Sequence, residues 1–260
     1  MTEAAPRRAR IMAVTSGKGG VGKTFVSANL AAALARLGER VLVLDADLGL
    51  ANLDVVLNLF PKITLHDVFT GRHALDEAIL PAPGGFSVLL AGSGMVEYSR
   101  MTPQVREQLQ KVVAEVATRF DRVLLDTGAG ISDVVLYTTS LADEVLVVAT
   151  PEPTSITDAY ATIKVLATTQ GRHDLRLLVN QVRRPGEGRG VHGQLQQVLE
   201  RYVAATLEGG LRLTLLGEVP VDGAVREAVQ RRELLLQAMP GAQASQALMA
   251  MATRLADAAG

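Results

Sequence analysis

The chain has 260 residues, of which 48% are hydrophobic and 20% are charged, and its formal net charge is −1. These values predict a folded chain with a substantial core, organised as one α/β domain over residues 1–260, and they give no overall charge for binding nucleic acid. The chain contains no cysteine, which excludes disulfides, thiol nucleophiles and cysteine-ligated zinc or iron–sulfur sites.

Residues 1–10 form a short basic N-terminal extension. The apolar run that follows, Ile11–Val14, is too short for the core of a signal peptide. Elsewhere no apolar run reaches the ~20 residues that a membrane-spanning helix needs. The sequence therefore predicts a cytoplasmic protein.

Short β-branched or leucine-rich runs alternate with longer helical patterns along the chain. This alternation predicts a mostly parallel sheet with helices on both faces. The expected strands are 11–14, 41–45, 86–90, 122–126, 144–150, 175–180 and 215–219. The expected helices are 23–37, 103–119, 132–141, 155–169, 193–205, 223–238 and a C-terminal helix at 244–259. Residues 183–190, with one proline and three glycines, predict an extended irregular loop.

A phosphate-binding motif lies between the first expected strand and the first expected helix. Residues 17–24 read GKGGVGKT, with the spacing Gly, four residues, Gly-Lys-Thr. Glycines let backbone N–H groups converge on a phosphate, and the helix N-terminus adds positive potential. Lys23 is expected to contact the β- and γ-phosphates, and Thr24 to bind Mg²⁺. The motif thus predicts a Rossmann-like P-loop NTPase fold. The expected nucleotide-binding residues here are Gly17, Lys18, Gly19, Gly20, Val21, Gly22, Lys23, Thr24 and Phe25.

Carboxylates follow two neighbouring expected strands. Asp126 closes one strand and is expected to bind the nucleotide's Mg²⁺. Asp45 and Asp47 follow another strand, and alternation along a strand places them on one side. Phosphoryl transfer needs a positioned water and neutralised charge, for which Asp47 and Lys18 are the candidates beside Lys23. Asp47 is also a candidate metal ligand.

With Lys18 in its first half, the motif resembles the deviant Walker A motif of the MinD/ParA ATPases. In that family the corresponding lysine reaches across a dimer interface to the partner's nucleotide. The resemblance therefore implies an ATP-dependent homodimer and slow, Mg²⁺-dependent ATP hydrolysis. It covers nearly the whole chain, from about Ile11 to the last helix.

Three further segments are similar to the FlhG/FleN branch of this family: 45–54 (DADLGLANLD), 126–131 (DTGAGI) and 150–160 (TPEPTSITDAY). That branch limits flagellar number and placement. The division-site MinD branch usually carries Ser-Pro-Ala-Gly where residues 127–130 read Thr-Gly-Ala-Gly, so it ranks second. Two more hypotheses are a ParA-like partition ATPase that binds DNA and a non-hydrolysing nucleotide-dependent adaptor. DNA is not the expected partner.

The same resemblance implies that Asn180 hydrogen-bonds adenine and that Pro220, Val221 and Asp222 wall the base. An amide at a strand's C-terminal end can offer both a donor and an acceptor to a base. The alternative for Asn180 is a turn residue.

The two terminal segments of the sequence are relevant to the choice between a protein partner and a membrane. Flagellar members of the family often carry an N-terminal activator segment for a signal-recognition-like GTPase, and residues 1–10 show no such motif. A flagellar transcriptional activator is therefore an alternative partner. The helix 244–259 has one cation, Arg254, and no aromatic residue, so it is expected to pack on the domain. Peripheral association with the inner face of the membrane is the weaker alternative.

Overall fold

The computed structural model describes residues 8–48, 52–92 and 101–258 of the chain. Within these ranges it contains one eight-stranded sheet with the strand order β3-β4-β2-β5-β1-β6-β7-β8. Each neighbouring pair is parallel except β3 and β4, which pair antiparallel at one edge. The strands are β1 (Arg10–Ser16), β2 (Val41–Ala46), β3 (Ile79–Pro81), β4 (Ser87–Leu89), β5 (Arg122–Ala129), β6 (Glu144–Ala149), β7 (Asp174–Val182) and β8 (Arg212–Pro220).

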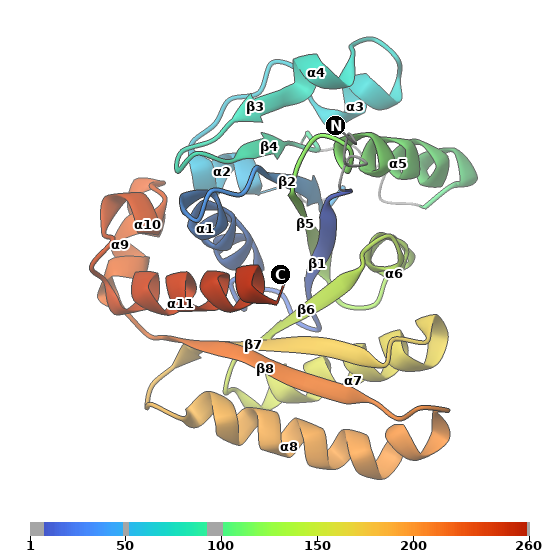
Figure 1. Ribbon diagram of the computed structural model, residues 1–260, viewed down its shortest axis with the longest axis vertical. Helices are drawn as coiled ribbons and strands as arrows, with labels where there is room; N and C mark the ends of the chain where they lie inside the picture. Colours follow the sequence, from blue (N-terminus) through green and yellow to red (C-terminus); the bar gives the residue numbers. More distant parts are fainter. Residues whose placement is uncertain (1–7, 49–51, 93–100, 259–260) are drawn as a thin grey trace, which may run out of the picture.

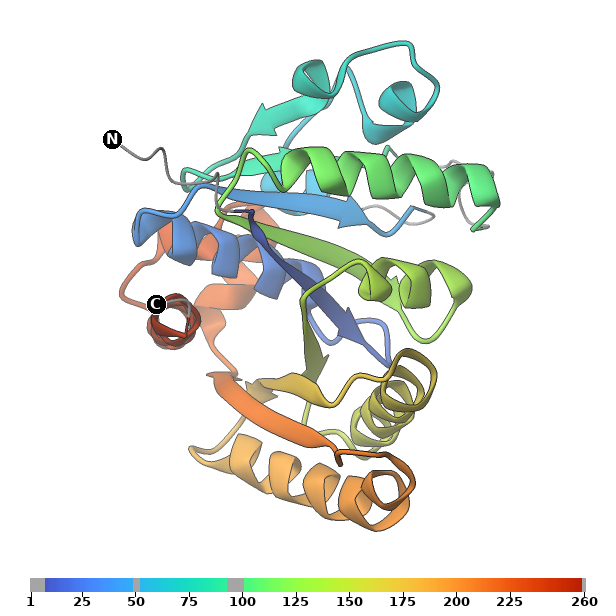
Figure 2. The same cartoon turned by 45° about the vertical axis from the view of Figure 1, so that its right-hand side comes forward.

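Helices cover both faces of this sheet (Figures 1 and 2), as the sequence pattern predicts. The helices are α1 (Lys23–Arg36), α2 (Leu53–Leu57), α3 (Leu65–Phe69), α4 (Leu75–Ala78), α5 (Pro103–Val116), α6 (Asp133–Ser140), α7 (Pro153–Gln170), α8 (Glu187–Tyr202), the 3-10 turn η2 (Ala204–Thr206), α9 (Gly223–Arg231), α10 (Leu235–Ala238) and α11 (Gln243–Asp257). In Figure 2, α1 and α11 lie on one side of the sheet, and α5, α6 and α7 lie on the other.

Two cores result, one on each face, and the central strands contribute to both. In β1, Ile11 and Ala13 belong to one core, whereas Met12 and Val14 belong to the other. Successive side chains of a strand point to opposite faces, so a strand covered on both sides is apolar along its whole length. This explains why the expected strands can be recognised as continuous apolar runs.

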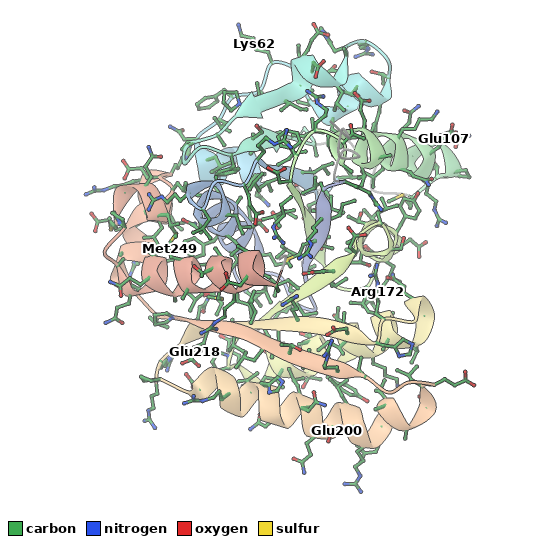
Figure 3. The ribbon with its side chains drawn as sticks, viewed as in Figure 1. Lys62, Glu107, Arg172, Glu200, Glu218 and Met249 are labelled. Atoms are coloured by element: carbon green, nitrogen blue, oxygen red, sulfur yellow. The ribbon has the colours of Figure 1, made fainter. Side chains whose placement is uncertain are left out.

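The expected loop at residues 183–190 is wrong in its second half, because α8 begins at Glu187. Gly186 takes a positive φ of 84° as the N-cap residue. The carboxylate of Glu218 accepts hydrogen bonds from the backbone N–H groups of Gly186 and Gly188, both at 2.8 Å. Glu218 lies on β8 beside the start of α8 (Figure 3). A carboxylate from a distant strand therefore caps the helix, and the glycine-rich segment alone does not show this.

The expected helix 223–238 is interrupted. It ends at Arg231, and Arg232 adopts a left-handed conformation with φ of 55° before α10 begins. The C-terminal helix packs on the domain as expected, with Leu248, Met251 and Leu255 buried against α1 and β8. Within the described ranges, no helix is long and apolar enough to cross a membrane.

Candidate functional site

The glycine-rich loop runs from the end of β1 to the start of α1. Gly22 is the N-cap residue of α1, with φ of 94°, a conformation that side chains disfavour. A Cβ on Gly17 would lie 2.2 Å from the carbonyl oxygen of Asp158 in α7. The loop therefore needs glycine at its start because it passes directly against a helix backbone, and at its end because of its φ angle.

A cavity of about 850 Å³ opens beside this loop. Its wall includes the loop, Asp47 after β2, Asn52, the end of β5 and the start of α6. The predicted residues that line it are Gly19, Gly20, Gly22, Lys23, Thr24, Phe25 and Asp47. The first turn of α1 faces this cavity, so its free backbone N–H groups and its positive dipole end are directed at a bound anion.

Lys23 and Asp126 form the charged centre of the site. Burial lowers the pKa of Lys23 below its ordinary value, while the charges of Asp126 and Asp47 act in the opposite direction. Burial raises the pKa of Asp126 from 3.8 to about 6, against hydrogen bonds from Thr24 and Ser27 and the charge of Lys23. The Ser27 hydroxyl donates to this carboxylate at 2.8 Å. Asp126 is therefore held against the first turn of α1, at neutral pH mainly as a carboxylate.

Asp45 is the second buried carboxyl group at this edge of the sheet. It pairs in register with Asp126 across β2 and β5, and only 1% of it is exposed. Burial and the charge of Asp126 raise the pKa of Asp45 well above its ordinary value. Its Oδ1 accepts a hydrogen bond from the backbone N–H of Asp47, whereas its Oδ2 is buried without a hydrogen-bond partner among the described residues.

These oxygens fit a magnesium ion. Mg²⁺ prefers hard oxygen ligands, commonly carboxylates together with substrate phosphates. Thr24 and Asp47 line the cavity, and the Asp126 carboxylate lies behind them, hydrogen-bonded to Thr24 and close enough to interact with the charge of Asp47. The buried carboxyl group of Asp45 lies next to Asp126 on the neighbouring strand, behind these ligands. The three residues expected to bind the metal therefore lie close together, on α1, after β2 and on β5, and metal binding by them stays a prediction.

Lys18 is directed away from Lys23, the other lysine of the glycine-rich segment. Its Nζ atom donates to Glu152 at 3.0 Å and to the Thr154 hydroxyl at 3.1 Å, at the start of α7. The side chain is 40% exposed, and it does not line the 850 Å³ cavity as the described residues define it. Within one chain, Lys18 therefore points to the first turn of α7 and not to the phosphate site of its own loop.

A second cavity of about 380 Å³ adjoins the same loop. Gly20, Gly22 and Phe25 contribute to this cavity as well as to the first one. Its remaining wall includes the residues expected to surround a base: Asn180, Pro220, Val221 and Asp222. The two cavities are therefore adjacent, and the residues expected to surround a base lie in the second one.

Asn180 has a contact that the sequence does not reveal. Its Nδ2 donates to the backbone carbonyl of Val21 at 2.8 Å, and its Oδ1 accepts from the backbone N–H of Gln181 at 2.9 Å. A Cβ on Gly22 would lie 2.4 Å from the same Nδ2 atom. Asn180 therefore holds the glycine-rich loop from behind, in addition to lining the second cavity.

Asp222, which lines the second cavity, also accepts hydrogen bonds from the N-termini of two helices. Its Oδ1 accepts from the N–H of Ala224 at 2.9 Å, and its Oδ2 accepts from the N–H of Ala244 at 3.1 Å. One carboxylate thus caps both α9 and α11.

Sequence reasoning did not identify several residues of the site. Ser27 lies four positions after Lys23 on α1, so helical spacing could have identified it as a neighbour of Asp126. Val229 of α9 lines both cavities and carries no sequence signal, because only the tertiary fold brings α9 to the loop. Part of the 45–54 motif, residues 49–51, lies outside the described residues.

Comparisons with known proteins agree with this geometry. The family model described as "ParA: NUBPL iron-transfer P-loop NTPase" matches residues 7–256. The iron-transfer part of that description belongs to the family model, and this chain contains no cysteine.

Among curated proteins, the chain is similar to the antiactivator FleN of Pseudomonas aeruginosa, with 44% identity over 95% of this chain and 86% of the relative. It is similar to the flagellum site-determining protein YlxH of Helicobacter pylori, with 34% identity over 92% of this chain and 79% of the relative. Among solved structures, it is similar to the septum site-determining protein MinD of Pyrococcus horikoshii complexed with Mg-ADP, with 27% identity, a TM-score of 0.80, and coverage of 97% of this chain and 98% of that one. The chain therefore belongs to the ParA/MinD family of P-loop NTPases, and FleN and YlxH are among its homologues.

Proposed function

We propose that this chain is an ATP-dependent switch: two copies close face to face around ATP and Mg²⁺, and slow hydrolysis to ADP and phosphate separates them. The observation that carries the proposal is the position of Lys18. The phosphate cavity already has Lys23 as its own cation, while Lys18 is directed away to Glu152 and Thr154. A second loop lysine that does not line its own cavity is available to the cavity of a second copy once it leaves Glu152 and Thr154.

The residues of one chain divide the chemistry between them. The loop N–H groups and Lys23 bind and orient the phosphates, which supplies most of the catalysis in phosphoryl transfer. Thr24, Asp47 and Asp126 would hold Mg²⁺, which neutralises phosphate charge when it is bound. Asp47, beside Gly128 at the cavity wall, would orient the attacking water. Asn180, Pro220 and Asp222 would surround the adenine.

The relatives support a flagellar role. FleN is named as an antiactivator and YlxH as a flagellum site-determining protein, so we propose that the switch regulates flagellar number or placement. Its partner would be a flagellar transcriptional activator or a signal-recognition-like GTPase. We further propose that residues 1–260 act as one domain in the cytoplasm, with peripheral contact to the membrane as an alternative. A MinD-like or ParA-like positioning role is the second candidate, supported by the MinD structure.

The test is the solution mass by light scattering of the wild type and Asp47→Ala, each with ADP-Mg²⁺ and with ATP-Mg²⁺. We expect a monomer with ADP and a dimer with ATP, which Asp47→Ala should retain because it hydrolyses ATP more slowly. Lys18→Ala should abolish the dimer while still binding ATP, whereas the exposed Lys62→Ala should behave as the wild type. If the solution mass of every variant is the same with ADP-Mg²⁺ as with ATP-Mg²⁺, the switch is contradicted and the non-hydrolysing adaptor is favoured.

A further inference from the structure

A third hollow, of about 540 Å³, lies outside the nucleotide site, between the end of α2 and the α9–α10 segment. Its apolar floor includes Leu57 and Leu234, which are 2% and 3% exposed, and Leu59 and Met239 lie beside them. Arg231 and Arg232 stand at its rim. Among the described residues, it shares no lining residue with either nucleotide cavity. Its volume lies within the range of ligand pockets, about 300–1,000 Å³.

Thin walls separate this hollow from the nucleotide cavity. On α2, Val56 lines the nucleotide cavity and the next residue, Leu57, lines the hollow. On α9, Val229 lines the nucleotide cavity and Arg231 lines the hollow. Residues one or two positions apart on each helix therefore line the two spaces, so a change in the spacing of α2 and α9 alters both.

Both helices end at the hollow in an unusual backbone conformation. Asn58 after α2 and Arg232 after α9 have φ angles of 52° and 55°, and both line the hollow. Glycine would adopt this conformation without strain, and other residues are uncommon in it. Arg232 therefore places a long cationic side chain at a point where backbone energetics alone favour glycine.

The charge at the rim is incompletely neutralised. Arg231 is bound by Glu227 of its own helix at 2.6 Å. Glu233 also lines the hollow, but in the described ranges the guanidinium of Arg232 takes part in no hydrogen bond or ion pair. Phe60, which follows the lining residue Leu59, is 81% exposed. Exposed aromatic residues beside an apolar recess and an arginine are typical of protein contact sites.

We propose that this hollow docks a short segment of a partner protein that presents an acidic side chain to Arg232 and a bulky apolar side chain to the floor at Leu57 and Leu234. Docking and nucleotide state are coupled, because α2 and α9 form one wall of each space. A concave recess selects individual side chains, whereas a lipid surface requires a broad amphipathic face; this favours a protein segment over a membrane. The docking site stands independently of the nucleotide cycle, and only the coupling rests on the proposed function.

Arg232→Gly is the decisive variant, since it removes the guanidinium and relieves the positive φ, so the chain should fold at least as well as the wild type. Random 12-residue peptides displayed on phage are selected on the wild type and counter-selected on Arg232→Gly. We expect enriched peptides with Asp or Glu close to Leu, Met or Phe. They should bind Arg232→Gly at least about tenfold more weakly and should bind Arg201→Ala, which changes an exposed arginine of α8, as they bind the wild type. Enrichment without acidic residues, or no enrichment, overturns the proposal.

The absence of cysteine allows a single reporter at the site. Gln237→Cys places an environment-sensitive dye at an exposed residue that lines the hollow. The fluorescence of this dye should change when the enriched peptides bind, whereas the fluorescence of the same dye on Glu208→Cys should not. Peptide affinity should change about fivefold or more between ADP-Mg²⁺ and ATP-Mg²⁺, with the reciprocal change in nucleotide affinity. If calorimetry shows nucleotide binding without this change, the coupling fails and the switch stands. If nucleotide does not bind, the switch fails and the peptide result still decides the docking site.

Discussion

Replacing Asn180 by alanine should weaken phosphate binding itself, beyond any loss of contact with the base. The Nδ2 atom of Asn180 holds the Val21 carbonyl at 2.8 Å. The peptide bond between Val21 and Gly22 is trans and planar, so its N–H points opposite to that carbonyl, away from Asn180. Gly22 lines the phosphate cavity. Asn180 therefore fixes the direction in which the Gly22 N–H donates.

The size of the effect follows from these contacts. A neutral hydrogen bond contributes about 0.5–1.5 kcal/mol, and one to a charged group about 1.5–3 kcal/mol. Asn180→Ala removes the neutral bond to Val21, which is internal to the protein, and thereby misaligns the bond from the Gly22 N–H to the charged phosphate. Losing about 1–2 kcal/mol of that second bond should lower affinity roughly 5- to 30-fold. Inorganic tripolyphosphate with Mg²⁺ has neither base nor ribose, so its affinity reports on phosphate binding alone. Isothermal titration calorimetry measures the affinities of tripolyphosphate and of ATP for each variant.

Pro220→Ala provides the matched control. Pro220 lines the base cavity and is absent from the phosphate cavity as the described residues define it. Its replacement should weaken ATP and leave tripolyphosphate unchanged, whereas Asn180→Ala should weaken both. If Asn180→Ala weakens ATP but binds tripolyphosphate as the wild type does, Asn180 acts through the base alone, and the reasoning from the Val21 carbonyl is wrong.

Two further predictions concern stability. Asp126→Asn should stabilise the nucleotide-free protein at pH 8, where ionised Asp126 costs the folded state about 3 kcal/mol, because its pKa is raised from 3.8 to about 6. This gain in the free energy of unfolding should shrink as the pH falls from about 6 towards about 4, because Asp126 of the folded wild type then takes up a proton. Urea denaturation in EDTA at pH 8 and at about pH 4 measures the gain, and an equal gain at these two pH values contradicts the prediction. Asp222→Ala removes the shared cap of α9 and α11, which should cost about 1–3 kcal/mol and lower the melting temperature by about 3–10 °C. Asp222→Asn should lose less, and a melting curve within a degree of the wild type for Asp222→Ala would refute the double cap.

The sequence predicted the central sheet because its strands are buried on both faces and are therefore continuous apolar runs. It missed β3, which has only three residues and ends in Pro81. A short edge strand of this kind has no distinguishing pattern. The start of α8 depends on Glu218, and the break after α9 depends on the backbone at Arg232. Local propensity cannot determine either feature, because one is a tertiary contact and the other is a strained residue.

The phosphate side of the site was predictable for a different reason. Residues 17–24 are contiguous, so their spacing alone defines the motif. Asp126 was expected at the end of the strand 122–126, and it is buried within β5, which continues to Ala129. The contact between Asn180 and Val21 spans 159 positions along the chain. The sequence could place Asn180 at the ligand edge of the sheet but could not show that its amide supports the loop.

The α9 helix is a weakly buried wall of the nucleotide site. Ala228 is its one buried residue among those described. It is bounded by Gly223 at one end and by the left-handed Arg232 at the other. Both flanks are fixed: Asp222 caps α11, and the backbone of Leu236 is bonded to Asn29 and Arg36 of α1. A weakly buried helix between two fixed ends rotates more easily than the sheet beneath it. Since Val229 faces the nucleotide cavity and Arg231 faces the hollow, such a rotation changes both sites together, and this is how the nucleotide can control docking at a site that it does not touch.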